Sequence, residues 1–537
     1  MVALGLLAAA CSNGGSSSAG STPSTAKGAG TSPTGTPAPA DFNQPSFTGS
    51  PRTGGSVTIG VEANVASLDP AGNLIQVSDI DTGLALYDPL VSFDDKGNFG
   101  PALATKWTNS ADLKTWTITL RTGVTFGDGT PFGPDAVVKQ YERLKDPATQ
   151  CACIADVSLI SAVKATGPST VTFTLTQPNA FFVSALAKPT AYIASPTAVA
   201  KWGKDYARHP VGTGPFELKS YDPLVLVRNP HYWKKDAKGR SLPYLQQITV
   251  KPITDNQVRL QSLESGAIDL MQVGDTATII NALATKKFTV QKITGSASTT
   301  LSFNNRKPPF SDVRLRQAVA YAVNRDEINQ VLYKGALQPA YSSFSITSPY
   351  YDANAGWLKY DPAKAKQLVA AAKADGEPTS FTLTCVTSDQ SRSLLAIVKR
   401  QLAAVGLNAD LTFVDQGAYV NQLLGAAHDY TMGCSRNGAT VTPDLYDGWY
   451  STGANNAEGF NDKKADSIMV AIRKTTDPKQ LVTLAGQLQH ELGTQVPGFP
   501  LVYDLFANVA TTSISGLNRP EPNQLGAIQF AYLYRKV

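Results

Sequence analysis

The sequence predicts an α/β protein that is divided into at least two lobes. Its 537 residues exceed what one hydrophobic core holds, because single cores stop growing near ~250–300 residues. In the C-terminal half, strand-like runs alternate with amphipathic helices, a pattern typical of strand-helix-strand units in a largely parallel sheet. Apolar residues make up 42% and charged residues 17% of the chain, which are values typical of globular proteins.

The N-terminus predicts a signal peptide over residues 1–10 and lipid attachment at Cys11. Residues 2–10 form an apolar run that ends in small residues just before the cysteine. The placement resembles a bacterial lipoprotein signal, in which that cysteine becomes the lipid-bearing first residue of the mature chain. The sequence departs from that pattern because no Lys or Arg precedes the run and because Ala8 stands where Leu is preferred. The alternative is a buried N-terminal strand or helix with an ordinary cysteine.

Residues 11–53 are predicted to form a flexible tether. From position 12 to position 40 the chain consists almost entirely of Ser, Gly, Thr, Pro and Ala, and Lys27 is the only charged residue. Such a segment has little apolar surface to offset the entropy of ordering it. A tether of this length would span on the order of 35 Å.

The other four cysteines form an even set, which is compatible with two disulfides in an oxidising extracytoplasmic compartment. Cys385 and Cys434 lie in strand-like runs of one predicted lobe, so they are candidates for one bond. Cys151 and Cys153 lie in a loop, where a bond across one residue is feasible. Metal binding is the alternative, but the four histidines have no ligand spacing with these cysteines.

The elements of the folded part begin near residue 54. Alternating strands are predicted at residues 56–62, 115–121 and 170–175, and a helix is predicted to begin at Pro134. Two more strands follow the turn at residues 212–215. A strand-helix-strand unit follows, in which Asp255 caps the helix and Gly266 ends it.

The C-terminal half predicts longer helices. Two amphipathic helices are expected in residues 311–333 and 361–376, the second with Asp361 and Pro362 at its start and Gly376 at its end. Strands and helices then alternate through the sequences FTLTCVT, SRSLLAIVKRQLAAVG, ADLTFVD, AYVNQLLGAA and DYTMGCS.

The motifs of common catalytic sites are missing from the sequence. It contains no GxxxxGK[ST], HExxH, GxSxG or CxxC, and the turn at residues 212–215 lacks the third glycine and following helix of a phosphate loop. Asp94 and Asp95 lie in a glycine-bearing turn, where acidic residues are usually solvated. The net charge is +5, and no cluster of Lys and Arg interleaved with aromatic residues would follow a phosphate backbone. We therefore expect neither an enzyme nor a nucleic-acid-binding protein, and we expect no cofactor and no metal.

Seven stretches resemble, in order, the extracytoplasmic solute-binding proteins of ABC importers. They are YDPLVSFDDKGNFGPALATKW, VTFGDGTPFGPDAV, HPVGTGPFELKSY, RNPHYW, LESGAIDLM, SFNNRKPPFSDVRLRQAVAYAVNRDEI and YDPAKAKQLVAAA. The resemblance is to the family of dipeptide, oligopeptide and nickel receptors, called bacterial extracellular solute-binding protein family 5. It implies a two-lobed periplasmic-binding-protein-like fold (type II, cluster C) with an extra domain on the first lobe.

The resemblance also implies domain boundaries and a hinge. Lobe I would comprise residues 54–98, 210–297 and 504–537, the extra domain residues 99–209, and lobe II residues 298–503. The chain would cross between the lobes near residues 298–303 and 497–503. A ligand held between the lobes favours their closed arrangement, which the permease recognises.

The ligand wall is likewise expected from the resemblance, at ten residues. They are Asn64, Val65, Ser302, Phe303, Gly433, Cys434, Ser435, Arg436, Asn437 and Tyr503. The alternative for Val65, Phe303 and Tyr503 is an ordinary place in a hydrophobic core. By this resemblance, the chain has Arg436 or Asn437 at the position where peptide receptors of the family carry an aspartate that pairs with the ligand's α-amino group. An arginine there would repel an ammonium and prefer a carboxylate, unless it is only a solvated surface residue.

The expected function is that of a monomeric, lipid-anchored receptor on the extracytoplasmic face of a bacterial cell membrane. It would capture a peptide or similar small polar solute and deliver it to an ABC permease and, through it, to ATPase subunits. The alternatives are an extracellular hydrolase and a sensory or adhesion lipoprotein on the same scaffold.

Overall fold

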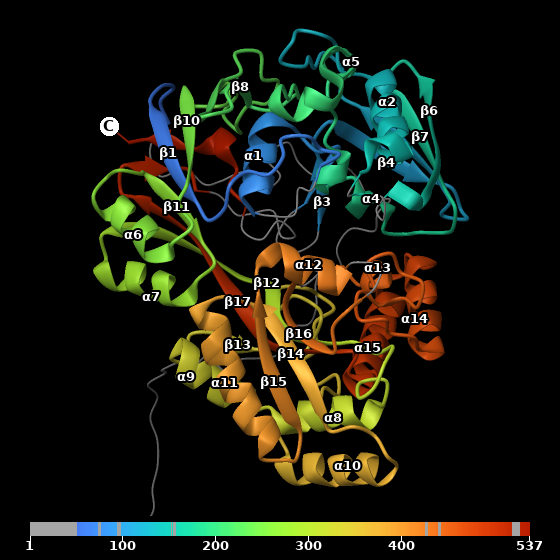
Figure 1. The fold of residues 1–537 in the computed structure, drawn as a ribbon. Coiled ribbons are helices and arrows are strands. Elements are labelled where there is room, and N and C mark those ends of the chain that lie inside the picture. Colours follow the sequence, from blue (N-terminus) through green and yellow to red (C-terminus); the bar gives the residue numbers. More distant parts are fainter. Residues whose placement is uncertain are drawn as a thin grey trace, which may run out of the picture.

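One mixed sheet of eleven strands passes through both lobes of the molecule (Figure 1). The computed structural model describes residues 51–72, 77–93, 98–151, 153, 157–424, 428–438, 442–517 and 527–536. The predicted signal peptide, Cys11 and most of the predicted tether lie outside these residues. In spatial order the strands are β15 (Asn408–Val414), β14 (Ser380–Val386), β16 (Met432–Gly438), β12 (Phe288–Phe303), β17 (Gly498–Thr511), β11 (Leu270–Val273), β1 (Ser56–Val61), β10 (Gln247–Pro252), β9 (Leu224–Arg228) and β8 (Phe216–Ser220), and β13 (Gln338–Pro339) pairs with β17.

Two long strands, β12 and β17, connect the upper and lower lobes of Figure 1. They pair in antiparallel fashion from Phe288 opposite Thr511 to Ser302 opposite Gly498. The pairing is interrupted between Thr294 and Ser298, where Gly295 has a φ of 76°. A Cβ atom at Gly295 would lie 2.6 Å from a side-chain carbon of Ile346, so both the backbone conformation and the space require glycine there.

The lower lobe is an α/β unit, as predicted, but its sheet is mixed rather than largely parallel. β14 runs parallel to β15 and β16, whereas β12 is antiparallel to both β16 and β17. The antiparallel pair arises because β12 carries the chain into this lobe and β17 carries it out. The helices of the lobe are α8 (Val313–Ala322), α9 (Arg325–Tyr333), α10 (Pro362–Ala374), α11 (Asp389–Ala403), α12 (Gln416–Leu424), α13 (Tyr446–Trp449), α14 (Lys463–Arg473) and α15 (Pro478–Gln495).

The predicted helix boundaries are confirmed where capping residues marked them. The Asp361 carboxylate accepts the Lys364 backbone N–H at 3.0 Å, and Gly376 follows α10 with a φ of 89°. Asp255 likewise caps its helix, and Gly266 follows with a φ of 76°. Side-chain acceptors at the start and left-handed glycines after the end therefore locate these helices, as the sequence predicts.

The upper lobe is built around β1, which runs parallel to its two neighbours β10 and β11. The turn at residues 212–215 packs against this lobe's first helix. Cβ atoms at Gly212 and Gly214 would lie 2.2 and 2.3 Å from backbone atoms of Leu86, so the glycines serve close packing. The other elements are α1 (Val77–Leu86), α5 (Pro196–Trp202), η3 (Gly203–Arg208), α6 (Asn256–Glu264), α7 (Thr276–Thr285), η4 (Phe530–Tyr532) and the two-stranded pairs β2 (Val91–Phe93) with β3 (Phe99–Pro101) and β18 (Ile514–Ser515) with β19 (Tyr534–Arg535).

A separate four-stranded antiparallel sheet stands beside the upper lobe, coloured cyan to teal in Figure 1. Its buried core includes Trp116, Phe173 and Phe182. We call this part of the molecule the four-stranded unit. Its elements are β4 (Ala104–Asn109), β5 (Thr115–Leu120), β7 (Thr170–Leu175), β6 (Ile160–Gly167), α2 (Pro134–Lys145), η1 (Pro147–Thr149), α4 (Phe182–Ala185) and η2 (Pro189–Ala191).

Both predicted cysteine pairs form disulfides. The bonds join Cys151 to Cys153 and Cys385 to Cys434, with Cα atoms 5.0 and 5.3 Å apart. The second bond links the adjacent strands β14 and β16. Over the described ranges, no helix combines the length and the apolar character that a bilayer crossing requires.

Candidate functional site

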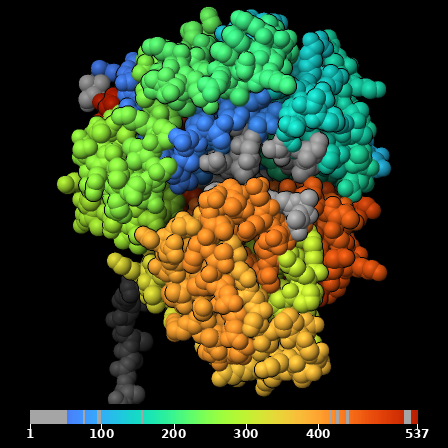
Figure 2. All heavy atoms as spheres, in the orientation of Figure 1, coloured from blue at the N-terminus to red at the C-terminus, as the bar shows by residue number. Residues whose placement is uncertain are grey.

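The carboxyl ends of the parallel strands of both lobes face the gap between the lobes. β1 and β11 end at Val61 and Val273 in the upper lobe, and β16 ends at Gly438 in the lower lobe. A nitrogen of the Arg436 guanidinium lies 3.5 Å from the carbonyl oxygen of Gly274, so the two edges meet. Figure 2 shows a furrow between the upper and lower lobes. In open α/β sheets, ligands bind outside the carboxyl ends of the strands, which makes this edge the candidate site.

A hydrogen-bonded cluster of polar side chains lies on one face of β12 and β16. The hydroxyl oxygens of Ser302 and Ser435 are 2.8 Å apart, and Ser435 donates to the amide oxygen of Asn437 at 3.0 Å. Ser302 also donates to a carboxylate oxygen of Glu458 at 2.9 Å. We call Ser302, Ser435, Asn437 and Glu458 the polar cluster. Three of its four members were predicted from the sequence, and the structure brings them together.

Glu458 is the charged member of the polar cluster, and the sequence did not point to it. The residue is only 6% exposed, and burial raises the pKa of its carboxyl group, although the Ser302 hydroxyl and Asn437 partly offset that effect. The positive charge of Arg306 also acts to lower the pKa of the Glu458 carboxyl group. The Arg306 guanidinium donates hydrogen bonds to the carbonyl oxygens of Ala457 and Asn456 at 2.8 and 2.9 Å. The cluster therefore places a buried carboxyl group, hydrogen-bonded to Ser302, on this face of the sheet.

Gly433 and Cys434 position the neighbouring helix rather than present side chains. The Tyr419 hydroxyl on α12 donates to the Cys434 carbonyl at 2.5 Å, and a Cβ atom at Gly433 would lie 2.6 Å from that hydroxyl. The Cys434 sulfur is bonded to Cys385. These two residues thus let α12 approach β16 above the polar cluster.

Arg436 points to the opposite face of the sheet and is paired there. Its Nε lies 3.0 Å from a carboxylate oxygen of Asp504, whose other oxygen accepts the Thr299 hydroxyl at 2.7 Å. The guanidinium carbon lies 5.0 Å from the centre of the Phe506 ring, and the Arg436 side chain remains 37% exposed. Because Asp504 already balances its charge, Arg436 presents partly neutralised donors to the gap.

Asn64 and Val65 lie in the upper lobe, in the segment after β1. Asn64 is exposed, and Val65 packs partly buried against the lobe's hydrophobic core. The backbone N–H of Ala66 donates to Asp79 on α1 at 2.7 Å, which holds the segment in place. Burial raises the pKa of Asp79 to about 6, even though this hydrogen bond acts to lower it.

Phe303 and Tyr503 have side chains inside the lower lobe. Phe303 is 0% exposed and packs on Phe310, with ring centres 4.8 Å apart. Tyr503 is 2% exposed, and its hydroxyl donates to the carbonyl oxygens of Ser342 and Phe344 at 3.1 and 3.0 Å. In this conformation both side chains have the core role that was the alternative for them.

Three residues of the site are not indicated by the sequence: Tyr419, Glu458 and Asp504. Glu458 and Asp504 come from segments far along the chain from Ser302 and Arg436, and Tyr419 lies 15 residues from Cys434, so no motif spacing indicates any of them. Asp504 alone carried a signal, because it directly follows the predicted crossing at residues 497–503.

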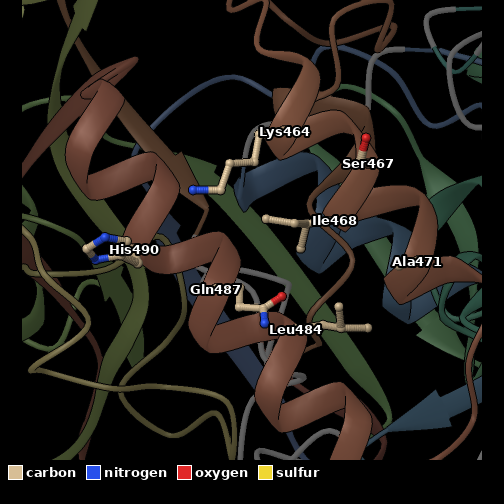
Figure 3. A pocket seen from close by; sticks show the side chains of 7 residues that line it. All are labelled: Lys464, Ser467, Ile468, Ala471, Leu484, Gln487 and His490. Carbon is tan, nitrogen blue, oxygen red and sulfur yellow. The ribbon is translucent and has the colours of Figure 1, made fainter.

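A surface groove of about 510 Å³ lies elsewhere, between α14 and α15 (Figure 3). Figure 3 shows Ile468 and Leu484 pointing into the groove from the two helices, with Lys464 and His490 near one end. None of the predicted ligand-wall residues lines it. The described residues contain no group of three or more His, Cys, Asp or Glu side chains arranged to hold a metal ion.

The sequence-family model of bacterial extracellular solute-binding proteins, family 5 Middle, matches residues 98–459 of the chain. The chain belongs to this family. The glutathione-binding protein GsiB of Salmonella choleraesuis is 29% identical over 480 residues, which cover 86% of this chain and 91% of that protein. The family assignment agrees with the resemblance noted in the sequence.

Solved structures of similar proteins show the same fold. The periplasmic binding protein DppA of Helicobacter pylori, in complex with the peptide STSA, is 24% identical with a TM-score of 0.79 and covers 90% of this chain and 99% of its own. The oligopeptide-binding protein AppA of Bacillus subtilis, in complex with a nonapeptide, is 22% identical with a TM-score of 0.79 and covers 91% of this chain and 100% of its own. The predicted two-lobed periplasmic-binding-protein-like fold is confirmed.

Membership of the family also confirms the coarse functional predictions. The protein is a solute-binding component for ABC import and not an enzyme, and its place is extracytoplasmic. The hydrolase alternative is therefore set aside.

Proposed function

We propose that the protein is the lipid-anchored receptor of an ABC importer and that it captures a peptide or similar small polar solute between its lobes. The observation that carries the proposal is the polar cluster, because its two partly buried members, Ser435 and Asn437, lie toward the carboxyl end of β16, where the lower lobe meets the upper lobe. Asn64 and Val65 from the upper lobe, and the ends of β12 and β16 from the lower lobe, would then form the ligand wall. Phe303, Gly433, Cys434 and Tyr503 would shape this wall from behind.

A ligand with a free amino group suits this site. Asn437 and the buried Glu458 carboxylate offer acceptors to an ammonium, and charge-assisted hydrogen bonds are stronger than neutral ones. The pairing of Arg436 with Asp504 removes much of the repulsion expected from the sequence. Glutathione, which the relative GsiB is named for binding, is a suitable first probe because it carries one amino group and two carboxylates.

Binding is tested by titration calorimetry and thermal unfolding of the purified extracytoplasmic part. The probes are glutathione, trialanine and N-acetyl-trialanine, extended to a peptide library of two to nine residues. We expect at least one probe to raise the melting temperature, since a ligand at 100 times its Kd stabilises the folded state by about 2.7 kcal/mol. The solute-capture proposal is wrong if no probe and no ligand retained from the native host is detected by calorimetry or mass spectrometry.

Membrane attachment would occur through a lipid on Cys11, followed by the tether of residues 11–53. Support comes from the apolar run before the cysteine and from the low-complexity segment after it. The Cys11→Ser variant should move from the membrane fraction to the soluble extracytoplasmic fraction, and a Cys11→Ser protein that still fractionates with lipid would rule the anchor out.

Delivery to a permease is the last step of the proposed function. Uptake of a labelled probe into vesicles that contain the cognate permease should require this protein and ATP hydrolysis by the permease's ATPase subunits. Uptake that proceeds equally without the protein would contradict the delivery step.

A further inference from the structure

The four-stranded unit touches the lower lobe directly, through residues that do not belong to the polar cluster. The backbone N–H of Ala180 donates to the Arg473 carbonyl at 2.8 Å, and the Gln177 side chain lies 3.4 Å from the Tyr446 hydroxyl. Figure 1 shows α4, which begins just after this segment, above α13 and α14. We propose that this contact is a latch that holds the lobes closed independently of ligand.

Apolar side chains make up the rest of the latch. Leu113 and Phe181 of the four-stranded unit are 7% and 5% exposed. They belong to one hydrophobic cluster with Tyr446, Met469 and Ile472 of the lower lobe. Separation of the lobes would expose this apolar surface to water, so the hydrophobic effect favours the closed arrangement.

Leu113 occupies a backbone conformation that disfavours leucine. It lies in the hairpin turn between β4 and β5 with a φ of 58°, in the left-handed region that glycine and asparagine adopt at lower cost. Its carbonyl accepts the Asn179 N–H at 3.1 Å, which joins the turn to the segment that carries Ala180 and Phe181. Leu113 has a strained backbone, and its side chain is buried against the lower lobe. Together these features indicate that the contact stabilises the closed arrangement of the lobes.

The lower-lobe side of the latch is rigid. The guanidinium of Arg473 donates to Asp444 at 2.8 Å and to Asp447 at 3.1 Å. It also lies over the Tyr446 ring at 3.9 Å, and the residue is only 4% exposed. These contacts fix the carbonyl that receives the Ala180 N–H, so the latch closes onto a preformed surface.

The latch residues are separate from the polar cluster and from Arg436. Part of the free energy of closure therefore comes from contacts that no solute makes, and the ligand-free protein populates the closed form. A solute then needs to supply only the remaining free energy, so the strength of the latch sets how far binding shifts the equilibrium.

Hydrogen exchange tests the latch without a known ligand. Retained solute is removed by reversible unfolding with the disulfides intact, and exchange of peptides covering residues 176–182 is followed by mass spectrometry. We expect this segment to be protected in the ligand-free wild type. Leu113→Gly should speed its exchange by about 10- to 100-fold, the factor that corresponds to exposing one buried leucine side chain, and should raise the radius of gyration in X-ray scattering.

Gln150→Gly is the matched control. Gln150 also has a left-handed backbone, with a φ of 50°, but it is exposed, so the variant should keep wild-type exchange at residues 176–182. Exchange of β5 and β7 should be unchanged in Leu113→Gly, which separates a latch effect from unfolding of the unit. If that variant misfolds by circular dichroism, Phe181→Ala replaces it. The latch is refuted if the wild-type segment exchanges like an unfolded peptide, or if the folded Leu113 or Phe181 variant exchanges like wild type.

Discussion

The two disulfides close chain loops of very different length, so their removal should have very different costs. Cys385 and Cys434 are 49 residues apart, whereas Cys151 and Cys153 are 2 apart. Loop-closure entropy assigns about 4 kcal/mol to the longer loop and about 1 kcal/mol to the shorter one at 25 °C. Cys151, Cys153 and Cys385 are buried and Cys434 is partly buried, so replacing either pair by alanine removes sulfur atoms that are mostly shielded from water.

The comparison of the two double alanine variants therefore isolates the loop term. Urea unfolding read out by hydrogen exchange gives separate transitions for the lower lobe and for the four-stranded unit. We expect the Cys385→Ala/Cys434→Ala variant to lose about 3 kcal/mol more in its own transition than the Cys151→Ala/Cys153→Ala variant loses in its own. Equal losses would refute the entropic argument and assign the stabilisation to local contacts of the sulfur atoms.

Three further substitutions test the site. Glu458→Gln should reduce the preference for trialanine over N-acetyl-trialanine by about 10-fold in calorimetry, because the ammonium loses its charged acceptor; an unchanged preference would contradict this role. Asp504→Asn keeps an acceptor for the Thr299 hydroxyl but removes the negative charge that pairs with Arg436. Succinylated peptides should therefore bind this variant about 5-fold more tightly than they bind the wild type at low salt, and equal affinities would argue against this role of Asp504. Asp79→Asn tests pH dependence. Burial raises the pKa of Asp79 in the folded state from 3.8 to about 6, so the native state binds more protons than the unfolded state between these pH values. The stability of the wild type therefore falls as the pH rises from about 4 to about 6. The stability gain of this variant over wild type should thus grow by about 1–2 kcal/mol between pH 4 and pH 7 in urea unfolding, and a gain independent of pH would disprove the assignment.

Local signals in the sequence located the elements well. Asp255, Asp361, Gly266 and Gly376 mark helix ends because caps and left-handed glycines act over a few residues of chain. The even set of cysteines also indicated both disulfides. The family motifs predicted the two lobes.

The site was less accessible to sequence reasoning, because its chemistry depends on partners from distant segments. Arg436 alone suggested repulsion of an ammonium, but the structure pairs it with Asp504, 68 positions further along the chain. Glu458 lies in a loop after α13 and reaches Ser302 only through folding. Sequence patterns at Phe303 and Tyr503 do not distinguish a core side chain from a ligand contact, and the structure shows both side chains buried.

The interruption of the β12–β17 ladder around Gly295 has a mechanical consequence. Strand pairs on either side of it keep their own hydrogen bonds, so each lobe can rotate as a rigid body while the strain falls on residues 295–297 of β12, which have no pairing with β17 to lose. The hinge between the lobes is then a bend within the sheet rather than a loop, and the plane of the sheet sets the direction in which the lobes open. A substitution that restored regular pairing there would stiffen the hinge without altering the structure of either lobe.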